Sequence, residues 1–300
     1  MNFGKRTPEA DSVRVIRRAL ERGVTFFDTA NAYVDGESER IVGRAVAKER
    51  DKVVLATKVG FGRIAGKPEG LSRARILAAC DESLARLATD HIDLYYLHVP
   101  DRQTPLAESL DALAELLEKK KILHWGVSNY ASWEILEMMH LADARNMPRP
   151  VMSQQIYNLL IRQLDVEYFK FTAKHPLATT VYNPLAGGIL SGKHTKGASQ
   201  KGTRFDGNRL YQGRYWNDAT FERVAALEGV AREEGVDMVT LAHAWVAGRP
   251  GVDAILLGPA SVAHLDSAID ACQKTLSPAA CTRIDALSRE WAGTDVTYAR

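Results

Sequence analysis

Apolar positions along the chain follow two alternating patterns. Short, nearly continuous apolar runs predict seven buried strands, at residues 24–28, 52–58, 92–98, 122–129, 151–158, 178–184 and 252–258. Between them, apolar residues recur every three or four positions, as Leu77, Cys80, Leu84 and Leu87 do in 74–89, which predicts amphipathic helices. Apolar strands that alternate with helices indicate a parallel sheet covered by helices. Nothing marks a domain boundary, so we expect a single domain over 1–300.

Two parts of this pattern are irregular. The helix predicted at 8–22 has no strand before it, whereas a closed barrel of alternating strands and helices needs eight strands. Either the sheet is open, or a first strand lies in the few residues around Met1 and is largely missing. The stretch 192–218 is rich in Gly, Lys and Arg, and a loop of that length is usually a functional lid or a disordered insert.

Composition narrows the class of protein. Apolar residues make up 46% of the chain and charged residues 25%, as in a soluble globular protein. A net charge of +2 is too small to indicate nucleic acid or a membrane surface as a partner. No apolar run approaches the roughly 18 residues of a membrane helix, and residues 1–10 do not resemble a secretory signal. Three cysteines without metal-ligand spacing predict a cytoplasmic protein with reduced thiols and no metal.

Polar side chains follow one predicted strand after another. In a parallel barrel the carboxyl ends of the strands meet on one face, where such enzymes carry their sites. Each placement alone has a structural explanation, because a lone His is often a core residue and an Asp before Thr is often a turn or a helix cap. The repetition over consecutive strands is what indicates a site. Its members are Asp28, Lys58, His98, Ser128, Asn129, Gln154 and Tyr182, with Tyr33 five residues after Asp28.

These residue types together suit the protonation of a forming alkoxide. A phenol has a reference pKa near 10, and a neighbouring ammonium favours its ionised form. A carboxylate keeps the lysine charged and oriented, and an imidazole N–H can bond the same substrate oxygen. The set contains no activated nucleophile and no metal cluster. The electrons must therefore come from a bound cofactor.

The motifs FDTANAY, ATK, LH and GVSNY, together with the Gln154 segment, resemble the aldo-keto reductases over the whole chain. The resemblance implies a (β/α)8 TIM barrel that binds a nicotinamide cofactor without a Rossmann domain. It makes Tyr33 the general acid, tuned by Lys58 and Asp28, with His98 orienting the substrate. The first strand would be truncated, because MNFGKR matches the part of the family that follows it. An internal or misassigned start codon is one explanation, and other backbone filling the gap is another.

Further segments, including YNPLAGGILSGK and RFDGNRLYQGRYW, are similar to the aflatoxin aldehyde reductase branch of NADPH-dependent dimeric enzymes. That similarity implies aldehydes or ketones as substrates, among them dicarbonyls and succinic semialdehyde. It places Tyr211, Arg214 and Arg300 on a substrate carboxylate, although Tyr211 and Arg214 are also explained as exposed members of a basic loop. It also implies that Ser128, Asn129 and Gln154 hold the nicotinamide carboxamide, that Tyr182 stacks on the ring, and that the segment 183–193 wraps the pyrophosphate and ribose. The implied cofactor-binding residues are Arg6, Asp28, Ser128, Asn129, Gln154, Tyr182, Asn183, Pro184, Leu185, Gly187, Gly188, Leu190, Gly192, Lys193, Arg204, Gly258, Ser261 and His264.

The match has one departure that bears on the cofactor. Many aldo-keto reductases outside this branch carry an arginine for the 2′-phosphate where this chain has Ala260. Lys193 and Arg204 remain as phosphate partners, so we expect NADPH, with NADH as the alternative. The main rival function is a nicotinamide-binding regulatory protein with little turnover, like the channel-associated members of the superfamily. An unrelated barrel lyase or isomerase would need a late phosphate-binding glycine loop, for which GPAS at 258–261 is too weak.

Overall fold

The structure of the protein is a computed structural model, which describes residues 2–197 and 201–294. All seven predicted strands are present, and each lies within two residues of the predicted limits at either end. Every recorded pairing among them is parallel. The strands are β1 (Phe26–Asp28), β2 (Val54–Val59), β5 (Ile92–Leu97), β6 (Ile122–Ser128), β7 (Met152–Ile156), β8 (Ala178–Tyr182) and β9 (Ala254–Leu256).

Helices separate these strands along the chain. The α-helices are α1 (Glu9–Glu21), α2 (Glu37–Val46), α3 (Arg73–Leu87), α4 (Leu106–Glu118), α5 (Ser132–Ala144), α6 (Tyr168–Lys174), α7 (Arg209–Tyr215), α8 (Asp218–Glu234), α9 (Met238–Ala247), α10 (Val262–Cys272) and α11 (Pro278–Ala292). Three short 3-10 helices are η1 (Ala47–Lys52), η2 (Gln163–Asp165) and η3 (Ala186–Ser191). In the part of the chain that is described, no helix is both long enough and apolar enough to cross a membrane.

The chain divides into two compact units. The described residues of Met1–Gln155, Leu177–Thr179 and Gly258–Leu265 form what we call the N-terminal unit. Those of Ile156–Pro176, Thr180–Leu257 and Asp266–Arg300 form the C-terminal unit. Most strands and helices lie within one unit, whereas β7, β8 and α10 have residues in both.

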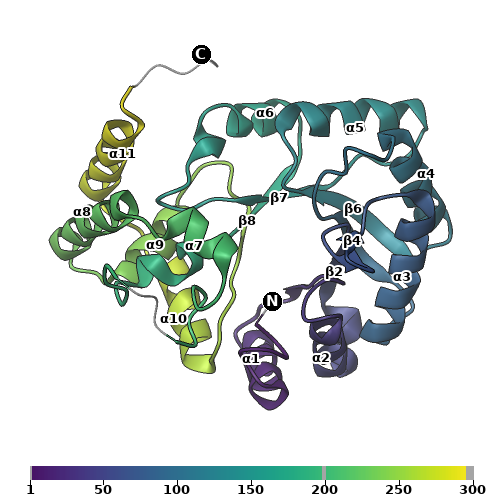
Figure 1. Cartoon of the computed structure of the whole chain (residues 1–300), viewed down its shortest axis with the longest axis horizontal. Coiled ribbons are helices and arrows are strands. Elements are labelled where there is room, and N and C mark those ends of the chain that lie inside the picture. The colour runs from purple at the N-terminus through teal and green to yellow at the C-terminus, as the bar shows by residue number, and fades with distance from the viewer. Residues whose placement is uncertain (1, 198–200, 295–300) are drawn as a thin grey trace. The chain divides into compact units, whose positions relative to one another are not determined.

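The main sheet of the N-terminal unit has the strand order β1-β2-β5-β6-β7. The register aligns Asp28 with Ala56, Lys58 with Tyr96, and Ser128 with Gln154. Each of the helices α1 to α4 packs against the helix that follows it in the chain. Helices α2, α3 and α4 lie on the outer side of the strands in Figure 1. Gly43 allows one of these approaches, because a Cβ there would lie 2.2 Å from the carbonyl oxygen of Leu87 at the end of α3.

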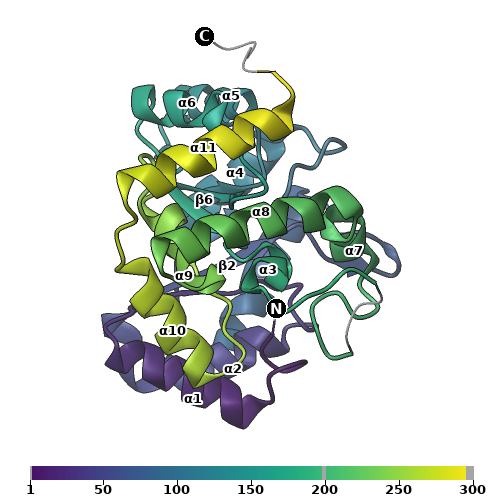
Figure 2. The same ribbon diagram turned by 90° about the vertical axis from the view of Figure 1, so that its left-hand side faces the viewer.

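The C-terminal unit pairs β8 with β9 and packs its helices around them. Val181 of β8 is aligned with Ile255 of β9. Helices α8 and α11 lie alongside each other, as both Figure 1 and Figure 2 show. Asn217 begins α8 by accepting the amide hydrogen of Thr220, and Ser277 begins α11 in the same way from Ala280. Side-chain acceptors of this kind satisfy amides that the first turn of a helix leaves unpaired.

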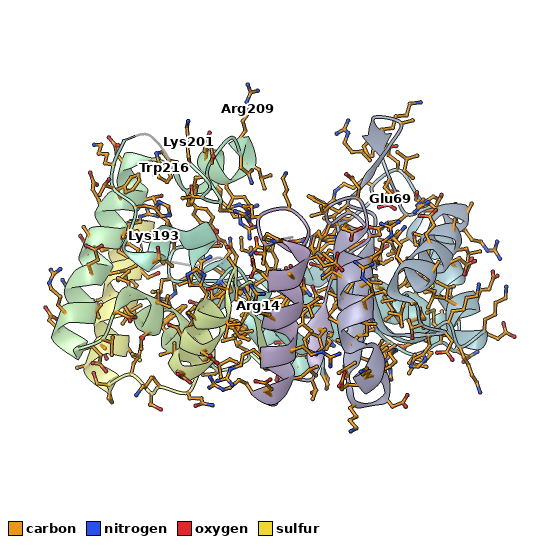
Figure 3. The ribbon with its side chains drawn as sticks, turned by 90° about the horizontal axis from the view of Figure 1, so that it is seen from below. Arg14, Glu69, Lys193, Lys201, Arg209 and Trp216 are labelled. Carbon is orange, nitrogen blue, oxygen red and sulfur yellow. The ribbon has the colours of Figure 1, made fainter. Side chains whose placement is uncertain are left out.

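Two elements were absent from the predicted pattern. Helix α7 lies inside 192–218, where we expected irregular structure; Tyr211 and Tyr215, one turn apart, are buried, while Arg209 points outward in Figure 3. A two-stranded antiparallel hairpin, β3 (Arg63–Ile64) with β4 (Lys67–Pro68), follows β2. Its turn residues Ala65 and Gly66 both have positive φ, as a tight two-residue hairpin turn requires.

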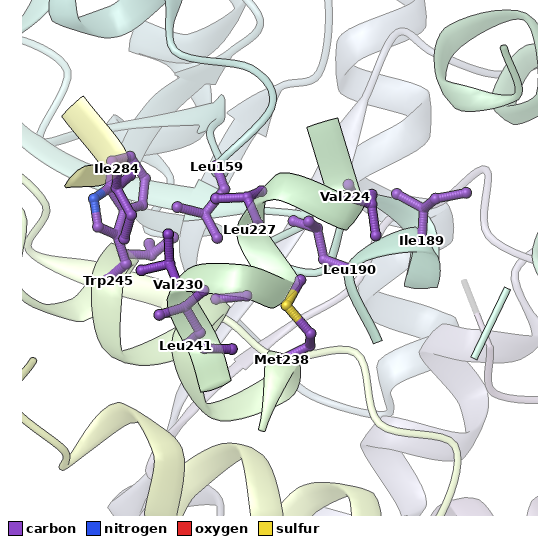
Figure 4. Close-up of a cluster of buried hydrophobic side chains, with 14 of the residues drawn as sticks. Leu159, Ile189, Leu190, Val224, Leu227, Val230, Met238, Leu241, Trp245 and Ile284 are labelled. Carbon is purple, nitrogen blue, oxygen red and sulfur yellow. The ribbon is translucent and has the colours of Figure 1, made fainter. Parts of the chain in front are cut away.

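A large apolar core fills the C-terminal unit. Figure 4 shows side chains from α8, α9, α11 and η3 meeting in one cluster, with Leu227 and Leu241 fully buried and Met238 beside them. Trp245 contributes the largest side chain and stacks on Tyr157 with ring centroids 5.3 Å apart. This core fixes η3 and α7, which carry five of the residues that the sequence assigned to cofactor and substrate: Gly187, Gly188, Leu190, Tyr211 and Arg214.

Candidate active site

The predicted catalytic residues lie together in the N-terminal unit, at the carboxyl ends of neighbouring strands. Asp28 ends β1, Lys58 is the penultimate residue of β2, and His98 directly follows β5. Ser128 ends β6, and its register partner Gln154 lies in β7. Parallel pairing brings these ends to the same edge of the sheet, which is the arrangement that the sequence predicted.

An ion pair between Asp28 and Lys58 forms the centre of the site. The Lys58 side chain has no exposed surface, and that of Asp28 is 6% exposed. The ammonium Nζ donates to Asp28 Oδ1 and, over 2.8 Å, to the carbonyl oxygen of Thr29. Burial lowers the pKa of Lys58, and the negative charges of Asp28 and Glu39 act in the opposite direction. Asp28 is therefore the main partner that keeps this buried lysine charged.

Tyr33 lies beside this ion pair. It belongs to a turn over residues 31–36 that follows β1, and its amide donates to the carbonyl of Ala30 over 3.0 Å. Lys58 Nζ is 5.4 Å from the centre of the Tyr33 ring, and the ring of His98 meets it edge-on at 5.7 Å. A phenol, an ammonium and an imidazole thus share one small space, as the proposed proton-transfer chemistry requires.

His98 is held as a neutral imidazole. The residue is 7% exposed, and burial first, then the charge of Lys58, lower the pKa of the ring well below its usual value. A neutral ring offers one N–H and one acceptor nitrogen. Within residues 2–197 and 201–294, the ring nitrogen Nδ1 is buried and has no hydrogen-bond partner. The backbone amide of His98 donates to the carbonyl of Val59, and its carbonyl accepts from the Asn129 side chain, so the backbone of His98 is held in place.

The three residues predicted to hold the nicotinamide carboxamide are hydrogen-bonded to one another and to the catalytic residues. Ser128 Oγ donates to the carbonyl of Gln154 over 2.9 Å and accepts from Asn129 Nδ2 over 3.0 Å. Gln154 Nε2 donates to Asp28 Oδ2 over 2.9 Å. Among the described residues the Gln154 side chain forms this one hydrogen bond, so its Oε1 retains acceptor capacity. That oxygen fits the N–H donors of a carboxamide, whereas the Ser128 hydroxyl is buried and already used in both directions.

Asn183 organises the predicted pyrophosphate loop, which lies in the C-terminal unit. Its Oδ1 accepts the amide hydrogen of Gly187 over 2.6 Å, and its Nδ2 donates to the hydroxyl of Tyr215. Gly187, Gly188 and Gly192 all have positive φ, which residues with a Cβ adopt rarely. At Gly187 space is also limiting, because a Cβ there would lie 2.7 Å from the Tyr211 ring. Tyr182 precedes this loop, and burial raises its pKa to about 12.

The other members of this loop differ in accessibility. Pro184 and Leu190 are buried and Leu185 is partly buried, whereas Lys193 is exposed.

Two of the three residues predicted to bind a substrate carboxylate, Tyr211 and Arg214, lie in the C-terminal unit. Tyr211 is buried, which is contrary to its interpretation as an exposed loop residue, whereas Arg214 is exposed. Arg204 and Arg214 both lie over the Tyr211 ring, 5.2 and 5.9 Å from its centre, so three predicted ligand-binding residues meet here. Arg300 lies outside the described residues.

Four further residues that the sequence assigned to the cofactor lie in the N-terminal unit: Arg6, Gly258, Ser261 and His264. Arg6 Nη2 donates to Asn2 Oδ1 over 2.7 Å, and Asn2 Nδ2 donates to the carbonyl of Gly258 over 3.0 Å. Ser261 Oγ accepts the amide hydrogen of His264 over 3.2 Å at the start of α10.

One buried carboxylate was missed by the sequence reasoning. Glu39 in α2 has no exposed side-chain surface, and its carboxylate accepts from Thr57 Oγ1 over 2.6 Å and from Arg86 Nε over 2.5 Å. Thr57 directly precedes Lys58 in β2, so Glu39 anchors the strand that carries the lysine. A Glu beside Ser38 on the apolar face of a predicted helix was the available signal.

Comparisons with known proteins agree with this geometry. The aldo/keto reductase family matches residues 1–289. Aflatoxin B1 aldehyde reductase member 2 from Homo sapiens is 34% identical over 97% of this chain and 84% of its own. Protein tas from Escherichia coli is 32% identical over 96% of this chain and 92% of its own. A probable voltage-gated potassium channel subunit beta from Arabidopsis thaliana is 31% identical over 86% of this chain and 80% of its own. These matches confirm the parallel β/α barrel class and the enzyme class that the motifs predicted, and the chain belongs to the aldo/keto reductase family.

Proposed function

We propose that the protein reduces aldehydes to alcohols with a reduced nicotinamide cofactor, and that Tyr33 is the general acid. One observation carries the proposal: the buried Asp28–Lys58 pair lies beside the Tyr33 ring, with Lys58 Nζ 5.4 Å from its centre and His98 at its edge. A charged, desolvated lysine in that position serves no evident packing purpose, because a buried ion pair adds little to stability. It does stabilise negative charge on a phenol or on a substrate oxygen.

The residues act on the carbonyl oxygen of the substrate. As the carbonyl carbon gains a hydride, its oxygen takes the proton of the Tyr33 hydroxyl, and water later returns a proton to Tyr33. The ammonium of Lys58 stabilises the phenolate left behind, and Asp28 keeps that ammonium charged. The neutral His98 ring donates an N–H to the same oxygen and so orients it. A bound reduced nicotinamide would supply the hydride.

We propose that Gln154 and Asn129 hold the carboxamide of that cofactor, that Ser128 orients both of them, and that Tyr182 stacks on the nicotinamide ring. The glycine-rich loop from Asn183 to Lys193 would bind the pyrophosphate through its backbone, as loops with left-handed residues do. The adenosine would lie near Arg6, Gly258, Ser261 and His264.

The cofactor that we propose is NADPH rather than NADH, because Lys193 and Arg204 supply positive charge for the 2′-phosphate. NADH is the alternative, because position 260 is an alanine. We also propose a cytoplasmic enzyme, in line with three free cysteines, and a homodimer, which rests on the family resemblance alone.

We propose aldehydes that carry a carboxylate as preferred substrates. The support is chemical, because the guanidinium of Arg214 offers paired donors suited to a carboxylate and lies on the same aromatic ring as Arg204. Dicarbonyls are a related class, and two human relatives are named as aflatoxin B1 aldehyde reductases.

A substrate panel tests this proposal. The protein is mixed with NADPH or NADH and with succinic semialdehyde or an uncharged aldehyde of equal length, and the loss of nicotinamide absorbance is followed. Arg214→Ala should lower kcat/KM at least about 10-fold for the carboxylated aldehyde alone, since a charge-assisted hydrogen bond contributes about 1.5–3 kcal/mol. Arg209→Ala, an exposed arginine of the same helix, is the matched control and should leave both rates unchanged. Equal losses on both aldehydes would reject the carboxylate role of Arg214.

The second candidate is a nicotinamide-binding regulatory protein with little turnover. The observation in its favour is the 31% identity to proteins named as probable voltage-gated potassium channel beta subunits. The same panel separates the two functions. Turnover at several per second on any aldehyde favours the reductase, whereas tight NADPH binding without turnover on the whole panel favours the regulator.

A further inference from the structure

Glu69 is a buried carboxylate that the proposed chemistry does not use. It follows the β3–β4 hairpin, where Figure 3 labels it, and its side chain is 2% exposed. Its Oε1 accepts from Asn31 Nδ2 over 2.6 Å and from Arg75 Nε over 2.9 Å. Its Oε2 accepts the backbone amides of Gly60 and Gly62 over 2.9 and 3.1 Å. Four donors therefore use the roughly four lone-pair sites of the carboxylate.

These donors belong to the segments that carry the site. Asn31 lies between Asp28 and Tyr33, in the turn that contains Tyr33, and its backbone amide donates to the carbonyl of Lys58. Gly60 and Gly62 flank Phe61, whose ring lies 5.0 Å from the ring of His98 at a tilt of 39°. Phe61 is 51% exposed, so packing alone does not fix it. One carboxylate thus joins the turn of the phenol to the aromatic neighbour of the imidazole.

We propose that Glu69 is a positioning residue of the site. It holds the Tyr33 turn through Asn31, and it holds the Phe61 ring against His98 through the amides of Gly60 and Gly62. Glu69 does not touch the reacting atoms and acts only through these residues. The kinetic part of this proposal rests on the proposed reductase function, whereas the placement of Phe61 on His98 does not.

Substitutions of Glu69 separate the effect of its charge and its two acceptor oxygens from the effect of its size. Glu69→Gln keeps the size of the side chain but exchanges one acceptor oxygen for an NH₂ group. That group must face two donors, either from Asn31 and Arg75 or from Gly60 and Gly62, so Glu69→Gln breaks one of the two connections, whereas Glu69→Ala removes both. Asn31→Ala removes only the connection to the Tyr33 turn. Glu82→Gln is the control, because Glu82 binds the far side of the same Arg75 and none of the residues of the site.

The first readout is the NMR chemical shift of the His98 ring protons, which the Phe61 ring current displaces. Phe61→Leu gives the value without the ring. We expect Glu69→Ala, which leaves the amides of Gly60 and Gly62 without their acceptor, to move the His98 signals toward that value, and Asn31→Ala and Glu82→Gln to leave them at the wild-type position. Wild-type shifts in Glu69→Ala would overturn the placement of Phe61 by Glu69. This readout needs no substrate, so it decides that part even if no aldehyde is reduced.

The second readout is the split between kcat and KM for a reduced aldehyde. Misplacing a reacting group by about 1 Å can cost about 100-fold in rate. We expect kcat to fall about 10- to 100-fold in Glu69→Ala and Asn31→Ala, with no change in Glu82→Gln. Variants that unfold at lower temperature but keep the wild-type kcat would show a structural role only and overturn the positioning of Tyr33. Absence of turnover in the wild-type protein would instead count against the proposed function.

Discussion

Replacing Asp28 by asparagine removes the negative charge that compensates the buried ammonium of Lys58. The Lys58 side chain has no exposed surface, and its other hydrogen-bond partner in the site is the neutral carbonyl of Thr29. Breaking a buried ion pair by removing one partner costs about 3–5 kcal/mol. The substituted amide still offers an oxygen to Nζ, so we expect the lower end, about 3 kcal/mol. At about 2–4 °C per kcal/mol, the unfolding temperature should fall by about 6–12 °C.

The loss of stability should depend on pH in a defined direction. Burial already lowers the pKa of Lys58, and without Asp28 only Glu39 opposes that effect. Between the lowered folded pKa and the unfolded value near 10.5, the unfolded chain binds more protons than the folded protein. Stability therefore rises with pH in that window, so the gap between Asp28→Asn and wild type should narrow from pH 7 to pH 10.

Urea unfolding followed by circular dichroism measures this change, with Asp11→Asn as the control. Asp11 makes an exposed ion pair with Arg14, and such pairs contribute little, so its variant should unfold like the wild type. If Asp28→Asn is no less stable than Asp11→Asn at pH 7, Asp28 does not compensate the charge of Lys58, and the proposed role of the pair is wrong.

Two further predictions concern other parts of the molecule. Burial holds the pKa of His98 well below 6.5, so as pH falls through 6.5 the unfolded chain gains a proton that the folded protein does not, and stability decreases. His98→Asn should reduce this loss in urea unfolding between pH 7 and pH 5, and an unchanged loss would contradict a buried neutral imidazole. Gly187→Ala meets the Tyr211 ring, whereas Gly235→Ala has the same positive φ with no atom within 4 Å. We expect Gly187→Ala to be about 1–3 kcal/mol less stable than Gly235→Ala, which is the usual cost of overpacking. Equal stabilities of the two variants would exclude the close approach of Gly187 to the Tyr211 ring.

The order of elements was predictable because buried parallel strands leave a clear apolar signal. All seven strands were found from such runs. Helix α7 was not predicted, because its two buried residues, Tyr211 and Tyr215, lie among basic and polar residues that obscure the helical repeat. The β3–β4 hairpin was missed because its two-residue strands lack an alternating pattern and depend on the left-handed turn at Ala65 and Gly66.

The candidate site was predictable by residue type but not by contact. Position at a strand end indicated Asp28, Lys58 and His98, and the structure brings all three together. Position along the chain could not indicate the hydrogen bond from the Gln154 amide to Asp28. The two residues are 126 positions apart, and their contact depends on the direction of the side chains across the sheet. The four bonds of Glu69 were equally hidden, because they depend on how the hairpin turns the chain back toward Asn31.

Single-turnover reduction of an aldehyde by the NADPH-loaded protein tests the central claim most directly. Tyr33→Phe removes the hydroxyl of a ring whose centre is 5.4 Å from Lys58 Nζ. Tyr96→Phe removes the hydroxyl of a ring whose centre is 5.5 Å from the same nitrogen, but that hydroxyl bonds Met152. If Tyr33 is the acid, Tyr33→Phe should slow the step about 100- to 10,000-fold with NADPH affinity unchanged, and Tyr96→Phe should stay within a few-fold of wild type. A Tyr33→Phe rate equal to that of Tyr96→Phe would contradict the account.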